Sequence, residues 1–215
     1  GDGKFEIVYG FLRSVGIGET RVRNVPVYIR KFHANNDIDG YIGLALISKF
    51  LTTIDYGDHT FTLAERPEVP AVPHADSVTV PLRLTASGFL SGEVQLAGID
   101  SPLNFIVDTG ASVSVISEEV ANLDAFESLV QQQRMRVIGA AGVTEDVPSY
   151  LLPKVSFGAN SRESVAAIAL DLDMINEASG FEQAGILGGN FLRNYRMTFD
   201  VKNSQVTFVP LEKVP

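Results

Sequence analysis

The chain has 215 residues, 45% of them hydrophobic, a formal net charge of −9 and no cysteine. This composition excludes a wholly disordered chain, a disulfide framework and thiol chemistry, and the acidic balance argues against a nucleic-acid partner, which would need clustered Lys and Arg. No apolar run approaches the roughly 20 residues that cross a bilayer, so no membrane span is expected in this sequence.

Short runs of alternating apolar and polar residues predict a mostly β chain. In chain order, strands are expected at 23–29, 78–84, 93–96, 165–170 and 205–209. Helical signals are few, and short helices are predicted at 47–50, 117–123 and 173–178. Residues 64–74 contain three prolines and few periodic apolar residues, which indicates an extended linker.

An internal repeat divides the chain. Residues 39–50 align without gaps with residues 184–195, which lie 145 positions later. The alignment continues through Asp55 and Asp200, so both copies are predicted to end in a β-hairpin. Upstream, residues 12–18 align loosely with residues 152–158 at a slightly different offset. The sequence therefore predicts a tandem repeat of one fold.

The first copy has no counterpart of the residues that open the second copy. We expect that the sequence begins inside the first repeat of a longer protein, because its start resembles an artificial or processed end. The other explanation is that the first copy lost its front half in evolution.

The tripeptide Asp108-Thr109-Gly110 is the clearest chemical signal, and it follows the apolar residues 105–107. A carboxylate placed there leaves a strand at a tight turn, where Gly110 relieves steric restriction. On its own the tripeptide favours a turn or a helix cap. The apolar strand before it and the Gly-Ile-Leu-Gly-Gly-Asn sequence at 185–190 make an active-site turn the better interpretation.

With both elements at this spacing, residues 79–209 resemble the retropepsin-like aspartic protease family, in particular bacterial members with tandem aspartyl protease domains. The resemblance implies a mostly β fold with a closed β-barrel domain. Residues 1–66 would form the C-terminal half of a first such domain, residues 67–75 a proline-rich linker, and residues 76–215 a complete domain.

The resemblance also implies roles for individual residues. Asp108 matches the catalytic aspartate, which in this family shares a proton with a second aspartate. Thr109 and Gly110 would support that dyad, and Ile186, Leu187 and Gly188 would pack beneath the aspartate loop. A flap covering the substrate is expected in the hairpin at 136–144, with the tip Gly139, Ala140, Ala141 and Gly142. Neither a cofactor nor a metal is implied.

The implied activity is that of an aspartic endopeptidase acting on a polypeptide substrate, with this chain carrying one half-site. The second aspartate would come from a homodimer partner or from an upstream domain, so an isolated monomer is expected to be inactive or weakly active. The open alternative is a non-catalytic peptide-binding or scaffold module that grips an extended peptide by strand addition. Location is not determined by the residues, although the resemblance favours the periplasm or secretion.

Two other aspartate pairs have structural explanations. Alternation places Asp171 and Asp173 on one face of a strand, and a solvated strand face explains them better than catalysis or calcium binding. Asp55 and Asp200 occupy equivalent positions of the repeat, which indicates a shared role in a turn.

Overall fold

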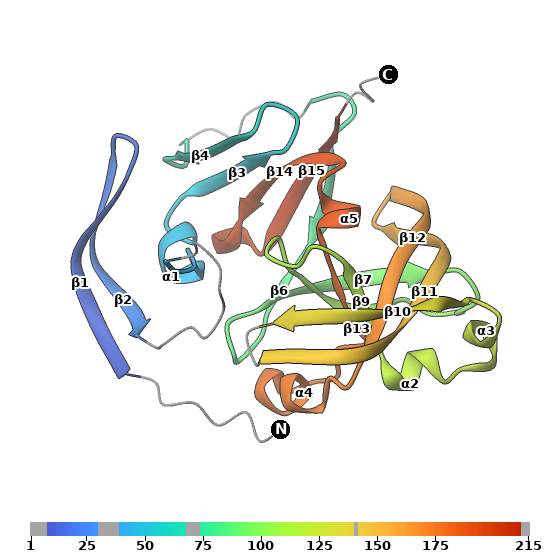
Figure 1. Ribbon diagram of the computed structural model, residues 1–215. Helices are drawn as coiled ribbons and strands as arrows, with labels where there is room; N and C mark the ends of the chain where they lie inside the picture. Colours follow the sequence, from blue (N-terminus) through green and yellow to red (C-terminus); the bar gives the residue numbers. More distant parts are fainter. Residues whose placement is uncertain (1–7, 30–38, 68–73, 140–141, 212–215) are drawn as a thin grey trace.

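The computed structural model describes residues 8–29, 39–67, 74–139 and 142–211 (Figure 1). Strands dominate, as the sequence predicts. Their bounds are β1 Val8–Ile17, β2 Thr20–Ile29, β3 Leu51–Asp55, β4 Thr60–Ala64, β5 Val78–Pro81, β6 Arg83–Leu84, β7 Leu90–Leu96, β8 Leu103–Val107, β9 Ser114–Ser117, β10 Val130–Gly139, β11 Gly142–Phe157, β12 Asn160–Leu170, β13 Gly185–Leu187, β14 Tyr195–Asp200 and β15 Gln205–Pro210. The helices are α1 Leu44–Ile47, α2 Glu118–Ala121, α3 Asp124–Glu127, α4 Asp173–Ser179, α5 Gly189–Leu192 and the 3₁₀ turn η1 Val201–Asn203. In the part of the chain so described, no helix is long and apolar enough to span a bilayer.

The largest sheet closes on itself. Its order is β10-β11-β12-β9-β13-β8-β7-β6, and β11 pairs in addition with β7, where Val155 lies opposite Leu96. The strands from β11 through β12, β9, β13 and β8 to β7 therefore form a ring. The predicted mostly β, closed-barrel fold is confirmed, and closure removes the open edges that these strands would otherwise present.

Apolar side chains fill the barrel because its strands alternate between the interior and the outside. The interior is built from fully buried residues on several of the ring strands, among them Val94, Leu96, Phe105, Ile116 and Phe157. The ring of Phe157 also packs edge-on against Phe208 of β15, with 5.5 Å between centroids. One core thus joins the barrel to the second sheet.

The second sheet has the order β4-β3-β14-β15-β5. It combines strands from distant parts of the sequence, since β3 pairs antiparallel with β14. Thr53 lies opposite Thr198 at the centre of this pairing, and their hydroxyl oxygens are 2.9 Å apart. The two threonines are 145 positions apart, which is the offset of the predicted repeat. The predicted hairpins that follow both segments are present as β3–β4 and β14–β15.

The hairpin β1–β2 stands apart from the barrel (Figure 1). Its residues Val22 and Val25 form a small separate core with Leu46 of α1. The hairpin has the same register as β11–β12, since Leu12 pairs with Val25 and Leu152 with Val165. The turn glycines correspond as well, because Gly18 and Gly158 both have positive φ, +55° and +60°. These two pairs of strands correspond at an offset of 140 positions.

Several predicted boundaries are wrong. The helix predicted at 47–50 is instead α1, which begins three residues earlier, at Leu44. The strand predicted at 78–84 is interrupted at Leu82 between β5 and β6. The helix predicted at 117–123 is the shorter α2, and Ser117 caps it by accepting a hydrogen bond from the Val120 amide at 3.3 Å. Within the predicted linker, residues 68–73 lie outside the described residues.

Candidate active site

Asp108 is the first residue after the buried strand β8. Its backbone N–H donates to the carbonyl of Leu187 at 3.1 Å, and its carboxylate Oδ1 accepts a hydrogen bond from the Gly110 N–H at 2.8 Å. The side chain is half-buried. The carboxylate is therefore held in a defined turn, with one oxygen engaged by the backbone and the residue still reachable from solvent.

The Gly-Ile-Leu-Gly element lies directly beneath this turn. Strand β13 runs parallel to β8, with Ile186 opposite Ile106 and Leu187 opposite Val107. A Cβ atom on Gly188 would lie 2.6 Å from the carbonyl oxygen of Val113, so only glycine permits this approach. The structure thus brings Ile186, Leu187 and Gly188 under the loop that carries Asp108.

A hydrogen-bond network ties the aspartate loop to α5, and the sequence did not predict its centre, Ser114. The Ser114 hydroxyl donates to Asn190 Oδ1 at 2.8 Å and accepts from the Gly188 N–H at 3.1 Å. Asn190 also donates through Nδ2 to the Ala166 carbonyl at 2.6 Å. The only sequence signal was the position of Asn190 at the end of the Gly-Ile-Leu-Gly-Gly-Asn sequence. This network fixes the loop between β8 and β9.

Two further side chains, Tyr56 and Arg193, lie close to the aspartate loop and were not predicted from the sequence. Burial raises the pKa of Tyr56 above its ordinary value, the positive charge of Arg193 lowers it, and the negative charge of Asp108 raises it. Tyr56 therefore lies within electrostatic range of both charged groups and stays a neutral phenol at physiological pH. Arg193 is anchored by its Nε, which donates to the Gly189 carbonyl at 3.0 Å. No local motif marks either residue, because only tertiary packing brings them together.

Thr109 projects from the loop without a hydrogen bond to another described residue, and both Thr109 and Gly110 are exposed. The resemblance gives this threonine a partner across a dyad. The described part of the chain offers no such partner, so the dyad-supporting role stays a prediction.

The hairpin predicted as a flap is formed by β10 and β11. Gly139 pairs with Gly142 at its end, and Ala140 and Ala141 lie outside the described residues. Between Val130 and Arg134 the register shifts, so that three consecutive glutamines face a shorter stretch of β11. The hairpin is thus established, whereas its movement over a substrate is a prediction.

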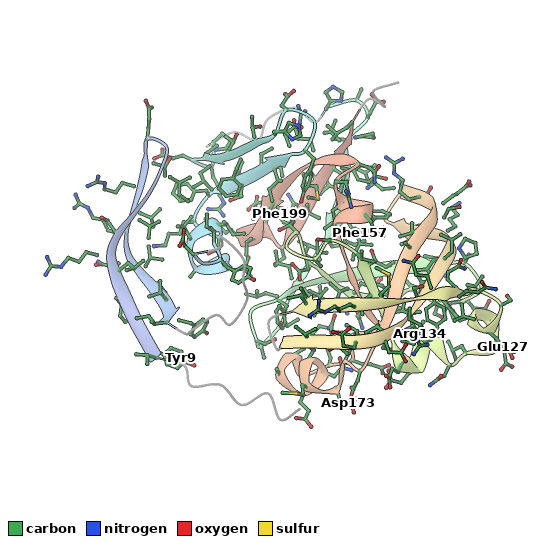
Figure 2. The ribbon with its side chains drawn as sticks, in the orientation of Figure 1. Tyr9, Glu127, Arg134, Phe157, Asp173 and Phe199 are labelled. Carbon is green, nitrogen blue, oxygen red and sulfur yellow. The ribbon has the colours of Figure 1, made fainter. Side chains whose placement is uncertain are left out.

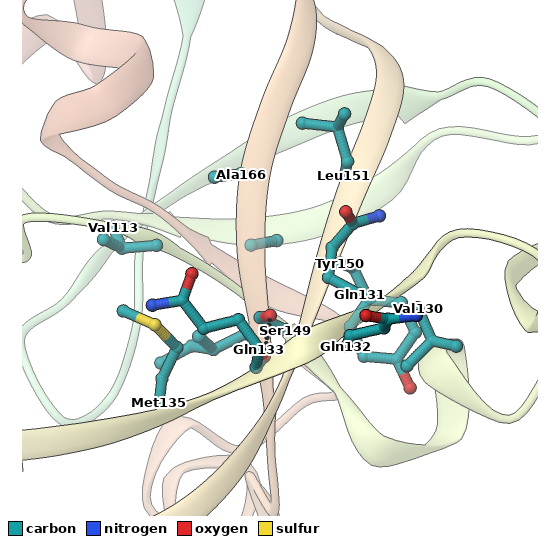
Figure 3. Close-up of a pocket in the computed structure, with 12 residues that line it drawn as sticks. Val113, Val130, Gln131, Gln132, Gln133, Met135, Ser149, Tyr150, Leu151 and Ala166 are labelled. Carbon is teal, nitrogen blue, oxygen red and sulfur yellow. Dashed lines mark hydrogen bonds between the residues drawn. The ribbon is translucent and has the colours of Figure 1, made fainter.

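An open cavity of about 680 Å³ lies beside this bulge (Figure 3). Its walls come from β10, β11 and β12, and Val113 of the aspartate loop closes one side. Gln131, Gln132 and Gln133 line it together with Met135 and Tyr150. Amide side chains both donate and accept hydrogen bonds, so this surface suits the polar backbone of an extended peptide.

Three other aspartates considered in the sequence, Asp55, Asp171 and Asp200, accept backbone hydrogen bonds in turns. The interpretation of Asp171 and Asp173 as a strand face is wrong, because β12 ends at Leu170 and the Asp171 carboxylate accepts from the Asp173 N–H at 2.8 Å at the start of α4. Asp55 accepts from the Asp58 N–H at 3.1 Å, and Asp200 accepts from the Asn203 N–H at 3.3 Å. Over the described residues, no group of three or more His, Asp or Glu side chains is arranged to hold a metal ion.

The glycines of the N-terminal segment provide a contrast. Gly40 and Gly43 lie 145 positions before Gly185 and Gly188. A Cβ on Gly185 would lie 2.3 Å from both the Phe105 ring and the Val115 carbonyl oxygen, whereas a Cβ on Gly40 or Gly43 would meet no described residue within 4 Å. The same backbone element is thus covered by an aspartate loop in one place and uncovered in the other.

Comparison with known proteins agrees with the sequence signals. Residues 92–191 match the family model described as aspartyl protease. A crystal structure of a retropepsin-like aspartic protease from Rickettsia conorii is 16% identical, with a TM-score of 0.42, and the alignment covers 61% of this chain and 89% of that one. EIAV protease in complex with the inhibitor HBY-793 is 20% identical, with a TM-score of 0.35, and 49% and 86% are covered. No curated protein matches the chain. The matched residues include Asp108 and the element at 185–191, so the predicted resemblance is confirmed.

Proposed function

We propose that this chain, whose residues 92–191 match the family model described as aspartyl protease, forms one half of the active site of an aspartic endopeptidase. Asp108 supplies one catalytic carboxylate and a second Asp-Thr-Gly turn supplies the other. The observation that carries the proposal is the Asp108 turn itself, in which a half-buried carboxylate is fixed by the Gly110 amide above a glycine-lined support.

The chemistry explains why one aspartate is insufficient. In peptide hydrolysis one ionised carboxylate takes a proton from the attacking water, while a protonated carboxylic acid hydrogen-bonds the carbonyl oxygen and stabilises its developing charge. Two carboxyl groups that lie close together share a proton because both cannot ionise, so one is available in each form. A single Asp108 provides only one of these forms at a time.

We further propose that the chain contains one complete domain and the trailing half of a second domain with the same architecture. The half-domain is at residues 1–66, the linker at 67–75 and the complete domain at 76–215. Three correspondences support the assignment: the shared register of β1–β2 and β11–β12, the shared hairpins β3–β4 and β14–β15, and the Thr53–Thr198 pair at the centre of the joint sheet. The pairing of Thr53 with its own equivalent is what a two-fold axis between two copies would produce.

The same symmetry indicates where the second aspartate belongs. Asp108 lies above Gly188, so the second turn belongs above Gly43, whose surface is uncovered. Strand β14 is already paired with β3 of the same chain, which leaves no room there for the same strand of a second copy. The second Asp-Thr-Gly therefore reaches the site by covering the N-terminal segment.

The hairpin β10–β11 and the cavity beside Gln131–Gln133 complete the proposed site. A polypeptide substrate lies extended against the glutamine amides, and the hairpin tip at 139–142 limits access of water. The cavity borders the aspartate loop through Val113, and Met135 and Val137 of β10 pack against the same apolar cluster as Val113.

A reconstituted tandem protein tests the proposal. Because the two hairpins correspond at an offset of 140 positions, a copy of residues 76–140 placed directly before Gly1 restores a complete first domain. We expect the resulting chain to cleave peptides as a monomer, and Asp108→Asn or the same change in the added copy to abolish cleavage.

The alternative, a peptide-binding module without catalysis, predicts a different outcome. The reconstituted chain would fold cooperatively and bind extended peptides, but it would not cleave them, and Asp108→Asn would leave peptide affinity unchanged. That combination would overturn the proposed protease function.

A further inference from the structure

The outer edge of β4 is unpaired among the described residues, where it ends the five-stranded sheet. At the opposite end of the same sheet, the corresponding strand β15 is covered by β5, and Thr207 lies opposite Thr79 with their hydroxyl oxygens 2.9 Å apart. Thr62 is the residue of β4 that lies 145 positions before Thr207. The pairing of β5 with β15 therefore indicates what kind of strand would pair with the outer edge of β4.

Burial differs between the two strands in the same way. Phe61 of β4 is 40% exposed, whereas Val206, its counterpart in β15, is fully buried. Unpaired edges that carry apolar side chains are sites where another strand adds by main-chain hydrogen bonding.

The hairpin β1–β2 shows a second surface of this kind. Leu12 is 47% exposed, whereas Leu152, its counterpart in β11, is 2% exposed. Tyr28 is 69% exposed, and its counterpart Ile168 is 5% exposed. Figure 2 shows Tyr9 on this outlying hairpin and Phe157 in the interior of the molecule.

Leu152 is buried in the barrel core. It belongs to the same buried cluster as Val94 of β7 and Phe105 of β8, and β11 pairs with β7 where Val155 lies opposite Leu96. One continuous segment, residues 78–116, therefore covers β15, Leu152 and Gly188 in the C-terminal part. Among the described residues, the three matching surfaces of the N-terminal part, which are the outer edge of β4, Leu12 and Gly43, are uncovered.

We infer that the N-terminal part is a docking surface for a polypeptide segment with the layout of residues 78–116, supplied from outside these 215 residues. Its first strand pairs antiparallel with β4 in the register of β5 on β15, which sets a threonine flanked by two β-branched residues opposite Thr62. Its following strands cover the apolar side chains of β1 and β2. This inference rests on the same missing segment as the proposed function, the one that would carry the second Asp-Thr-Gly turn, but it does not depend on catalysis.

A second copy of this chain is a poorer occupant. Its own residues 78–81 are already paired with its own β15, and its own aspartate loop is packed on Gly188. It would have to give up both sets of contacts before it could cover another molecule.

The register is testable by disulfide trapping, because the chain has no cysteine of its own. The probe is a synthetic peptide with the sequence of residues 76–84 and cysteine at the position of Thr79. With Thr62→Cys in the full chain, we expect a mixed disulfide to form on the order of tenfold faster than with peptides whose cysteine replaces Val78 or Val80, since neighbouring strand positions face opposite sides.

Thr207→Cys is the matched control, because β5 already occupies that edge and the peptide should not reach it. Thr62 is exposed, so its substitution should leave the fold intact, which the thermal melt verifies. Equal rates for the three peptides, no adduct at all, or a disulfide between two Thr62→Cys chains in place of the peptide adduct would overturn the inference. Peptide cleavage is not measured, so this result is separate from the test of the protease function.

Discussion

The elements β1, β2, α1, β3 and β4 have counterparts in the same order in β11, β12, α5, β14 and β15, yet only the second set contributes strands to the closed barrel. Val25 and Val165 occupy equivalent positions and are equally buried, each 4% exposed. Leu12 and Leu152 are also equivalent, but one is half-exposed and the other buried. Local hairpin contacts thus form in both places, whereas burial of the outer side chains and support of an aspartate loop require the segment 78–116.

The largest expected effect distinguishes the two hairpins through a matched pair of substitutions. Leu152→Ala removes a buried side chain from the barrel core and should lower the free energy of unfolding by about 2–5 kcal/mol. Leu12→Ala should change it by less than about 1 kcal/mol, because this side chain keeps much of its exposure in the folded chain. Chemical denaturation of both variants measures the difference. Equal losses would show that the N-terminal hairpin is already as closely packed as the barrel.

A second pair of substitutions tests the glycine supports. Gly188→Ala places a methyl group 2.6 Å from the Val113 carbonyl oxygen and should destabilise the protein by about 1–3 kcal/mol. Gly43→Ala has open space and should be neutral or slightly stabilising. The backbone conformations are alike, with φ of −98° at Gly188 and −102° at Gly43, so the difference would be steric. If Gly43→Ala lowers the free energy of unfolding as much as Gly188→Ala does, Gly43 is covered and the proposal of an open surface there is wrong.

The smallest effect concerns acid sensitivity of the two turn aspartates. Burial alone would raise the pKa of Asp200, but hydrogen bonds from Asn203 and Arg66, together with the charge of Arg66, hold it below its ordinary value. A carboxyl group whose pKa is lower in the folded protein stabilises it above the unfolded pKa of about 4, and this contribution is lost as the pH falls through the folded pKa.

Asp200→Asn should therefore lower the melting temperature slightly at neutral pH, and the gap to the unmodified protein should close in strong acid. Asp55→Asn is the comparison, because Asp55 has the same turn hydrogen bond and no ion pair with arginine among the described residues. Melting temperatures measured across the acid range give the result. A gap for Asp200→Asn that stays constant with pH would exclude the proposed role of the ionised carboxylate.

The sequence predicted those features that depend on local residues and on the repeat. The Asp108 turn follows from an apolar strand ending at Asp-Thr-Gly, and the element beneath it follows from glycines that allow close approach. The repeat also contained information that the helix prediction at 47–50 did not use, since α1 begins at Leu44 and α5 at Gly189, which are 145 positions apart.

Tertiary contacts account for what was not predicted. Barrel closure depends on Val155 of β11 meeting Leu96 of β7, a contact between strands that are distant in sequence. Tyr56 comes within electrostatic range of Asp108 and Arg193 because β3 pairs with β14, which the residues around Tyr56 in the sequence do not indicate. Asp171 was placed on a strand because alternation does not show that β12 stops at Leu170 and that its carboxylate caps the next turn.

The most direct test of the half-site is peptide hydrolysis by the unmodified 215-residue chain, purified as a monomer by size and compared with Asp108→Asn. If Asp108 is one of two required carboxylates, the monomer should cleave peptides no faster than the Asp108→Asn variant. Hydrolysis by a verified monomer that Asp108→Asn abolishes would contradict the account, because a complete site would then exist within this chain alone.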